Sequence, residues 1–569
     1  MKKSFSLFVL FQILILTTGS LFAGSKRVAW DFKDKKPDDP VNVIVQFKQD
    51  PTDTQHQKVI KRGGRFMRGL GPVRGGLYSL PPSALEDLAA DPDVVYITPD
   101  REVKGSLDYA NDTVGADVAL SLGLDGSGIG VAVIDSGITV GNDLKNGSTS
   151  RVVYSQNFSS GSGTSDAYGH GTHVAGIIGG NAYYSSCHSC TATFRGMAPN
   201  VKLINLRVLD ANGSGTDSAV IAAIQQAISL KDTYNIHVIN LSLGRGVYES
   251  YTLDPLCQAV EAAWKAGIVV VAAAGNEGRN DSQGTDGYGT ITVPGNDPYV
   301  ITVGAMKTMS STTRGDDLIA SYSSKGPTAL DHVVKPDLVA PGNKIISLVA
   351  SSSSTLYSQH PENLIPISYF RPGYTGNSVL YYRLSGTSMA TPMVSGAAAL
   401  LLQQNTNLTP DQVKARLMKT ASKSFPATST ATDPDTGVTY TSQYDIFTIG
   451  AGYLDIAAAL NNADLANLPA LSPKASYDAK TGNVYLVGID GQSLIWGNSM
   501  IWGTSLVWGN SLVWGNSLVW GNSLIWGNSM VWGNTTDQGC SLIWGNSLIW
   551  GNGTQVGNEA MSIAIRGEQ

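Results

Sequence analysis

The sequence predicts an α/β protein with a parallel central sheet, preceded by a small α+β unit and followed by a β-rich repeat. Three patterns indicate this order. An alternating stretch, VNVIVQF, lies at residues 41–47, well before the first fully apolar strand. Two β-branched runs, GIGVAVIDSG and IVVVAAAGNEG, each end in a polar residue and a glycine, as buried parallel strands often do. A six-residue period then fills residues 493–552.

The composition fits a large folded chain and excludes several classes of protein. Of 569 residues, 42% are apolar and 15% are charged, so a sizeable core is expected and wholesale disorder is excluded. The 63 glycines have no three-residue period, which excludes collagen. With 39 Lys+Arg against 45 Asp+Glu the net charge is −6, and no basic cluster is present. We therefore expect no nucleic-acid partner.

Residues 1–23 have the features of a signal peptide. Two lysines precede an apolar run from Phe5 to Leu16, and small residues follow. A membrane anchor would need about 20 apolar residues, and this run is shorter. We therefore expect a protein that is secreted or held at the cell surface, where disulfides are permitted.

The pattern of strands and a helix in residues 24–105 predicts a separate α+β unit. The strand at 41–47 is followed by a helix at about 83–90 and by a second strand, VVYIT, which Pro99 closes. From these residues alone, a binding domain and a pro-region are equally good interpretations.

Two motifs place an acid and an imidazole where a strand meets a helix. Asp135 follows a buried strand, at the carboxyl edge where sites of open α/β sheets gather, although a turn or capping role would also explain it. In DAYGHGTHVAGIIGG, His170 and His173 open a helix of small residues. Metal-binding pairs usually lie at i, i+4, and this pair lies at i, i+3, so a metal site is disfavoured and a structural role stays open.

A third motif, RLSGTSMATPMVSGAAALLLQQ, places Ser388 at the start of a long apolar helix. Serine there is most often a helix cap. A serine hydroxyl becomes an effective nucleophile when a base takes its proton and a carboxylate orients that base, and Asp135, His170 and Ser388 would supply these roles. The Asn276 amide, after the run that ends in AAAGNEG, could donate to a developing oxyanion, a contribution of roughly 3 kcal/mol.

The motifs VIDSG, HGTHVAG, VINLSLG, AAAGNEG and GTSMATP occur in this order and together resemble the subtilisin-like serine proteases. The resemblance covers about residues 106–460, and it implies a subtilisin-like peptidase domain that we place at 106–465. The roles it implies are Asp135 as orienting acid, His170 as general acid and base, Ser388 as nucleophile, Asn276 as oxyanion donor and His173 as a structural residue.

The resemblance also implies protein or peptide substrates, held as an added strand. No cofactor is implied for the chemistry, and we predict no metal among the site residues. A structural calcium is doubtful, because Asp143 matches one family ligand while the loop that supplies the others is replaced by NAYYSSCHSCTATFRG. Two trios match the positions at which the family binds substrate: Gly213, Ser214 and Gly215 in the first, and Ser242, Leu243 and Gly244 in the second. A Gly-rich turn would also explain the first trio.

With this resemblance, residues 24–105 are expected to be an inhibitory pro-domain that the enzyme itself removes near residues 100–106.

Within the peptidase domain, Cys187 and Cys190 could form a redox pair, half a zinc site or a plain disulfide, and export favours the disulfide. Cys257 and Cys540 could be free or joined to each other. The connection from Gly342 to Gly386 is expected to be an inserted surface loop.

A linker is predicted at 466–492, a hexapeptide repeat at 493–552 and a C-terminal tail at 553–569. The repeat consists of ten hexads of the form S-L-V/I-W-G-N, one of which has Gln538 in place of Trp. An even period returns each side chain to the same face of a strand, so we favour stacked short strands. The repeat could simply cover the enzyme, or its tryptophans could bind a cell surface or a polymer.

We therefore predict a secreted serine endopeptidase that is made as a self-processed precursor. Two alternatives remain open. The chain could be a surface repeat or adhesion protein that uses a protease-like scaffold, or it could transfer the acyl group to an amine, as peptide ligases and cyclases do. Hydrolysis and transfer pass through the same acyl-enzyme, so the sequence does not separate them.

Overall fold

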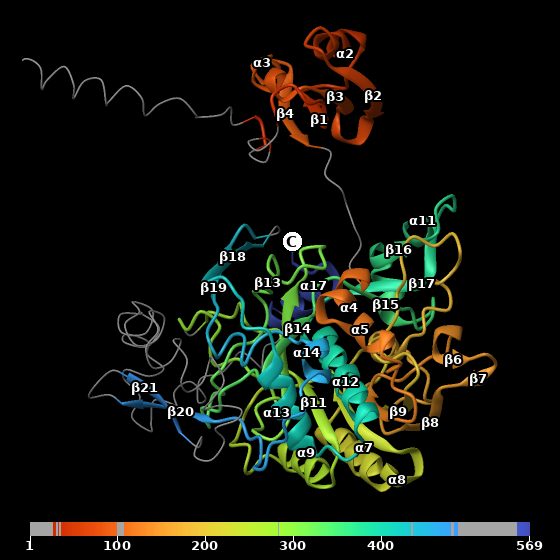
Figure 1. Cartoon of the computed structure of the whole chain (residues 1–569), viewed down its shortest axis with the longest axis vertical. Coiled ribbons are helices and arrows are strands. Elements are labelled where there is room, and N and C mark those ends of the chain that lie inside the picture. The colour runs from red at the N-terminus through yellow and green to blue at the C-terminus, as the bar shows by residue number, and fades with distance from the viewer. Residues whose placement is uncertain are drawn as a thin grey trace, which may run out of the picture. The chain divides into compact units, whose positions relative to one another are not determined.

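The computed structural model describes residues 27–29, 32, 36–99, 107–282, 284–433, 436–478, 483–487 and 555–568. The chain divides into two compact units, Met1–Val103 and Lys104–Gln569 (Figure 1). The predicted signal peptide and the predicted hexapeptide repeat lie outside the described residues. No helix within the described ranges is long and apolar enough to span a membrane.

The first unit is a four-stranded antiparallel sheet in the order β2-β3-β1-β4. The predicted strands at 41–47 and after residue 93 are β1 and β4, and the predicted helix is a 3-10 turn that continues into α3. The sequence analysis missed α2 and the β2–β3 pair. The elements are β1 (Val41–Phe47), α2 (Asp53–Ile60), β2 (Arg65–Leu70), η2 (Gly71–Val73), β3 (Gly75–Leu80), η3 (Pro82–Ala84), α3 (Leu85–Ala89) and β4 (Val94–Pro99).

One face of this sheet forms a core of its own. Alternate residues of β1, namely Val43, Val45 and Phe47, are buried, and they belong to a hydrophobic cluster that contains only residues of the first unit. The alternation read from the sequence therefore reports a sheet with one covered face.

The second unit is built on an eight-stranded sheet with β13-β12-β11-β10-β5-β9-β8 in order and β14 paired with β12. All pairs are parallel except β12 with β13. The strands are β5 (Gly130–Asp135), β8 (Val152–Asn157), β9 (Lys202–Arg207), β10 (Ile236–Leu241), β11 (Val269–Ala273), β12 (Ile301–Lys307), β13 (Leu318–Ile319) and β14 (Leu338–Pro341).

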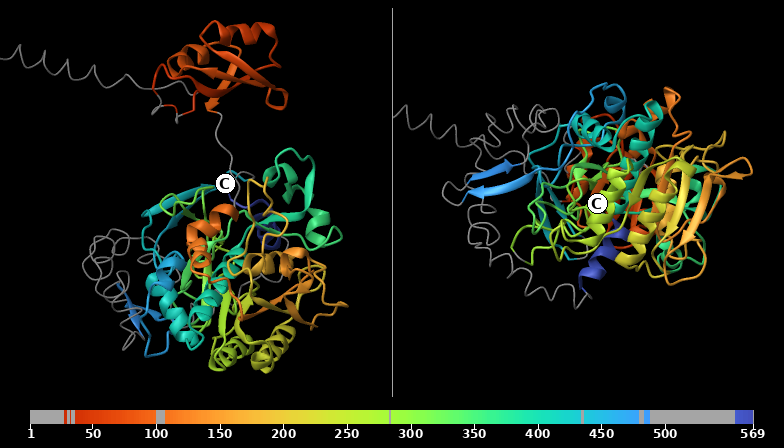
Figure 2. Two further views of the ribbon diagram at one scale, coloured as in Figure 1. Left: turned by 45° about the vertical axis from the view of Figure 1, so that its right-hand side comes forward. Right: turned by 90° about the horizontal axis from the view of Figure 1, so that it is seen from below.

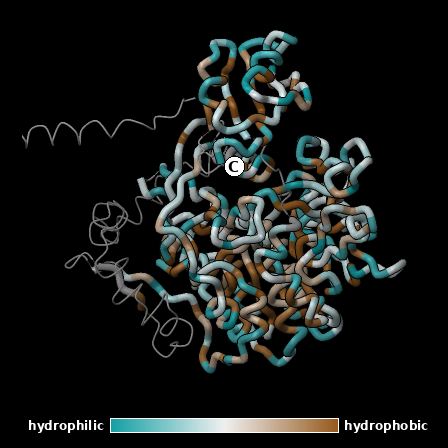
Figure 3. The backbone as a smooth tube through the Cα atoms, turned by 45° about the horizontal axis from the view of Figure 1, so that its top comes forward, coloured by the Kyte–Doolittle hydropathy of each residue, from teal (hydrophilic) through white to brown (hydrophobic). Residues whose placement is uncertain are grey.

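Two pairs of helices pack on this sheet. Helices α6 (His170–Gly179) and α12 (Thr387–Gln404) lie against each other, and α12 also contacts β10, β11 and β12. Helices α7 (Asp217–Ser229) and α9 (Pro255–Lys265) form the second pair. The hydrophobic residues concentrate in the interior that these layers enclose (Figure 3).

The expectation of a surface loop from Gly342 to Gly386 is wrong. This connection folds into a three-stranded antiparallel sheet in the order β15-β17-β16. Its aromatic side chains explain the difference, because Phe370 and Tyr381 are buried in the main core. The elements are β15 (Ile345–Leu348), α10 (Thr355–Gln359), η5 (Pro361–Asn363), β16 (Leu364–Pro366), α11 (Ile367–Phe370) and β17 (Asn377–Leu384).

The predicted linker and tail also differ from the structure. Residues at the start of the linker are packed in the second unit, where Ser472 Oγ donates to Asp337 Oδ1 at 2.6 Å. The tail contains a helix, α17 (Gln555–Arg566), that packs on β17. The remaining elements are α4 (Leu107–Val114), α5 (Ala116–Ser121), η4 (Asn142–Leu144), β6 (Lys145–Asn146), β7 (Thr149–Ser150), α8 (Lys231–Tyr234), α13 (Pro410–Thr420), β18 (Thr428–Thr432), β19 (Thr439–Gln443), α14 (Ile456–Leu460), β20 (Lys474–Asp478) and β21 (Asn483–Val487).

Candidate active site

The structure brings the predicted acid and imidazole together. Asp135 is the last residue of β5 and His170 is the first residue of α6. His170 Nδ1 lies 2.8 Å from Asp135 Oδ1 and 3.0 Å from Oδ2. Because Nδ1 faces a carboxylate, the proton of a neutral imidazole is held on Nδ1 and Nε2 is left as the basic nitrogen.

The surroundings of His170 shift its pKa upward. Burial by itself lowers the pKa, but the charge of Asp135, the hydrogen bond to it and the charge of Asp166 outweigh this effect. His173 behaves in the opposite way. Burial and the neighbouring His170 lower its pKa to about 3, and its Nε2 lies 3.1 Å from two backbone carbonyls, so it is a neutral core residue.

Asp166 is a positioning residue that the sequence analysis missed. Its carboxylate is buried, and it accepts hydrogen bonds from the backbone N–H groups of Gly169 at 2.7 Å and Thr172 at 2.8 Å and from the hydroxyl of Ser136 at 2.8 Å. These bonds satisfy donors at the start of α6 and fix the turn from which His170 projects. An Asp four residues before the first helical residue was the available signal.

Ser388 is the second residue of α12, as the sequence predicts. Its hydroxyl donates to the Ser242 carbonyl oxygen at 3.0 Å, and the Ser242 hydroxyl donates back to the Ser388 carbonyl oxygen at 2.8 Å. In this state the Ser388 hydroxyl is therefore bonded to Ser242 and not to His170. The hydroxyl must leave Ser242 before it can give its proton to an imidazole.

Asn276 follows β11 and contacts the turn that leads to Ser388. Its Oδ1 accepts from the Thr387 backbone N–H at 2.9 Å and from the Thr387 hydroxyl at 3.1 Å. These bonds use the carbonyl end of the side chain, so its amide nitrogen is left as a donor beside Gly386. The Asn276 amide nitrogen therefore lies beside Gly386, which precedes Ser388 by two residues in the chain.

A cleft of about 500 Å³ lies beside His170 and Ser242. It is lined by His170, by both predicted substrate-binding trios and by two residues of the C-terminal helix, Met561 and Ala564. The contribution of α17 has no counterpart in the sequence analysis.

The glycines of the two trios are required by packing inside the protein. An added Cβ at Gly213 would lie 2.7 Å from the Tyr168 ring, and one at Gly244 would lie 2.6 Å from Thr292 Oγ1. The first trio also forms a tight turn, because Asp210 Oδ1 accepts from the backbone N–H of Ser214 at 3.0 Å. The segment therefore forms a turn and also lines the cleft, and its binding of substrate stays a prediction.

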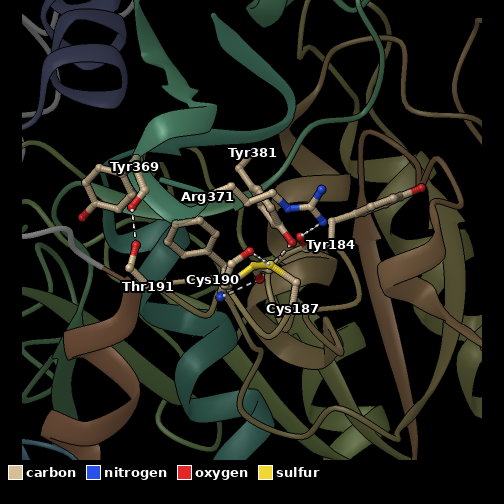
Figure 4. The surroundings of a disulfide bond; sticks show 10 residues. Tyr184, Cys187, Cys190, Thr191, Tyr369, Arg371 and Tyr381 are labelled. Atoms are coloured by element: carbon tan, nitrogen blue, oxygen red, sulfur yellow. Dashed lines mark hydrogen bonds between the residues drawn. A yellow bond between two sulfur atoms is a disulfide. The ribbon is translucent and has the colours of Figure 1, made fainter. Parts of the chain in front are cut away.

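Cys187 and Cys190 form a disulfide (Figure 4). The loop that carries them is tied to the 342–386 insertion, since the Thr191 hydroxyl donates to the Tyr369 carbonyl oxygen at 3.3 Å. Cys257 is a free, buried thiol, and Cys540 lies outside the described residues.

Asp143, which matches one family calcium ligand, is buried in the structure. Its Oδ1 accepts from the Tyr381 hydroxyl at 3.1 Å, and burial raises the pKa of its carboxyl to about 6. Within the described ranges, no three His, Cys, Asp or Glu side chains come together in a way that could hold a metal ion.

Fold and site together define a member of a peptidase family, and comparison with known proteins supports this. The Subtilase family model matches residues 126–443. The serine protease AprX of Bacillus subtilis is 36% identical over 392 residues, which cover 66% of this chain and 81% of that protein. Subtilisin E of Bacillus subtilis is 34% identical over 429 residues, covering 74% and 94%. An extracellular serine proteinase of Thermus sp. is 34% identical, covering 61% and 70%.

The chain therefore belongs to the subtilase family. It is a serine-type endopeptidase with a subtilisin-like α/β fold and a mostly parallel central sheet.

Proposed function

We propose that this subtilase is a secreted endopeptidase in which Asp135, His170 and Ser388 form the catalytic triad. The observation that carries the proposal is the hydrogen bond between Asp135 and His170, which lines the cleft, together with the bond of Ser388 to Ser242, which lines the same cleft. Catalysis needs no metal in this proposal, because the imidazole supplies the base.

In the first half of the reaction, the Ser388 oxygen attacks the carbonyl carbon of the scissile peptide bond. Its proton passes to Nε2 of His170, and Asp135 stabilises the imidazolium that results. When the C–N bond breaks, His170 returns this proton to the leaving amine and an ester to Ser388 remains. In the second half, His170 takes a proton from water, the hydroxide attacks the ester, and Ser388 recovers its proton as the acid leaves.

Two donors are proposed for the oxyanion. The first is the Asn276 amide, whose other end is fixed by Thr387. The second is the backbone N–H of Ser388, which lies in the first turn of α12, where N–H groups have no partner inside the helix. The substrate backbone is proposed to lie between the trios at 213–215 and 242–244 as an added strand.

The remaining parts of the proposal concern the precursor. Residues 1–23 direct export, residues 24–105 inhibit the enzyme and are removed by it, and the repeat at 493–552 covers the enzyme or attaches it to a surface or polymer. The separate core of the first unit supports its treatment as an independent domain.

The test is to compare the wild-type protein with Ser388→Ala on an unstructured protein substrate, with and without a serine-reactive inhibitor. We expect the variant to lose cleavage by about 10⁴-fold or more, as other triads do, and to accumulate as the uncleaved precursor. Ser229→Ala, on the exposed face of α7, is the matched control and should behave as wild type. Inhibitor-sensitive cleavage that persists in Ser388→Ala would refute the assignment.

A further inference from the structure

The C-terminal segment (residues 555–568) packs into the peptidase unit although residues 488–554 separate it from β21. Figure 2 shows α17, in dark blue, lying against this unit. Ile563 and Ile565 are 3% and 4% exposed and belong to the same hydrophobic cluster as the central sheet. The Asn363 side chain donates to the Ile565 carbonyl oxygen at 2.5 Å. The segment is therefore packed against the rest of the peptidase unit by both apolar contacts and a hydrogen bond to its backbone.

The docking site is built around one carboxylate. Glu568 is 2% exposed, and its Oε1 lies 2.5 Å from Lys307 Nζ. Its Oε2 lies 3.1 Å from Arg279 Nη2 and accepts from the N–H and the hydroxyl of Ser321 at 2.8 and 2.5 Å. Asn343 pairs with the Glu568 backbone through two hydrogen bonds of 2.7 Å. Both carboxylate oxygens and both backbone groups are therefore bonded to the peptidase unit.

This anchor holds the segment at the cleft. The Ser385 backbone N–H, three residues before Ser388, donates to the Ala564 carbonyl oxygen at 2.9 Å. Met561 and Ala564 line the cleft together with His170 and the trio at 242–244. A polypeptide that binds as an added strand needs backbone groups of this kind and the space beside them. The segment takes the Ser385 N–H and forms one side of the space beside the trio at 242–244.

We infer that the C-terminal segment is an intramolecular inhibitor, held by Glu568, which must leave the cleft before a protein substrate can bind. This inference rests on the proposed function, since it takes Ser388 as the reacting residue. The segment uses no group that the chemistry needs, so its release changes access to the cleft and leaves the reaction at Ser388 unchanged. Pro-domain removal and release of this segment are then two separate steps of activation.

The size of the effect follows from how often the cleft is open. If the segment is docked about nine-tenths of the time, apparent substrate affinity is reduced about tenfold, and removing the segment restores it. A small reagent needs less of the cleft than an unfolded protein does. The two kinds of probe should therefore respond differently.

The experiment compares the processed wild-type enzyme with Glu568→Gln and with a chain that ends at residue 554. A small fluorophosphonate titrates active sites, and labelled unfolded casein reports proteolysis per titrated site. We expect both variants to lower the KM for casein by about tenfold, with kcat and the fluorophosphonate rate changed less than twofold. A synthetic peptide of residues 555–568 should inhibit the shortened enzyme competitively. Glu249→Gln, on the surface, is the control.

Three results would overturn the inference. An unchanged or higher KM in both variants would show that the segment does not exclude substrate. Failure of both variants to fold or to react with the fluorophosphonate would show that the segment is needed to build the site. A lowered KM in the shortened enzyme that added peptide does not raise again would show that the segment does not compete with substrate for the cleft. A wild-type enzyme that cleaves casein without labelling at Ser388 would instead refute the proposed function.

Discussion

The active-site cleft has two walls that are built in different ways. The wall at Ser242 to Gly244 continues directly from strand β10, and Thr292 leaves no room for a Cβ at Gly244. The wall at Met561 and Ala564 comes from the far end of the chain and is held by the bonds of Glu568. The first wall follows a strand of the central sheet, whereas the second is a separate helix that contributes no strand to that sheet. Chemistry should therefore belong to the first wall, and control of access to the second.

Among the variants that test this division, Asp135→Asn should have the largest effect. The amide keeps the shape of the side chain but favours the wrong tautomer of His170, so kcat should fall about 10⁴-fold, as in other triads. Casein KM should change little, because the trios and the C-terminal segment are untouched. Steady-state kinetics at several pH values measures both constants. Asp117→Asn, on the exposed side of α5, serves as control. A change in KM without a fall in kcat would contradict the division.

Asn276→Ala should have the next largest effect. Removal of the corresponding donor in subtilisin costs roughly 10²- to 10³-fold in kcat, and the same range is expected here. The variant also loses two bonds to Thr387, so thermal unfolding must be followed in parallel. A folded Asn276→Ala protein with wild-type kcat would remove Asn276 from the proposed mechanism.

The smallest effect concerns pH. Only neutral His170 accepts a proton from Ser388, so kcat/KM should rise with pH through the pKa of His170. Because that pKa is raised, the midpoint should lie above 6.5. The effect on stability has the opposite sign: the contribution of protonated His170 is complete below its unfolded pKa and is lost as pH rises through the folded value.

Asp166→Asn sharpens the pH prediction. Removing this charge should lower the midpoint of the acid limb, since Asp166 contributes to the upward shift of the His170 pKa. The pH profile of kcat/KM for the two proteins gives the difference directly. A midpoint that moves upward, or an activity that is independent of pH down to about pH 4, would contradict the assignment of His170 as base.

Much of the site could be predicted because its residues lie at the ends of strongly patterned elements. The run before Asp135 is β5, the run before Asn276 is β11, and the helix expected at Ser388 is α12. The mouth of a parallel sheet then brings such residues together.

Other features had no local pattern. The bond between Glu568 and Lys307 spans 261 residues, and neither residue lies in a motif. The 342–386 insertion also lacked a clear period, so its small sheet was mistaken for a loop. Asp166 had a signal, its place before a helix, but a cap and a functional carboxylate look the same in a sequence.

The mass and position of a covalent adduct test directly whether Ser388 is the nucleophile. The processed enzyme would be treated with a fluorophosphonate, digested and analysed by tandem mass spectrometry. We expect one adduct, on Ser388, whose formation slows as pH falls through the pKa of His170 and which is absent in Ser388→Ala. An adduct on another residue, formed in parallel with loss of casein cleavage, would contradict it.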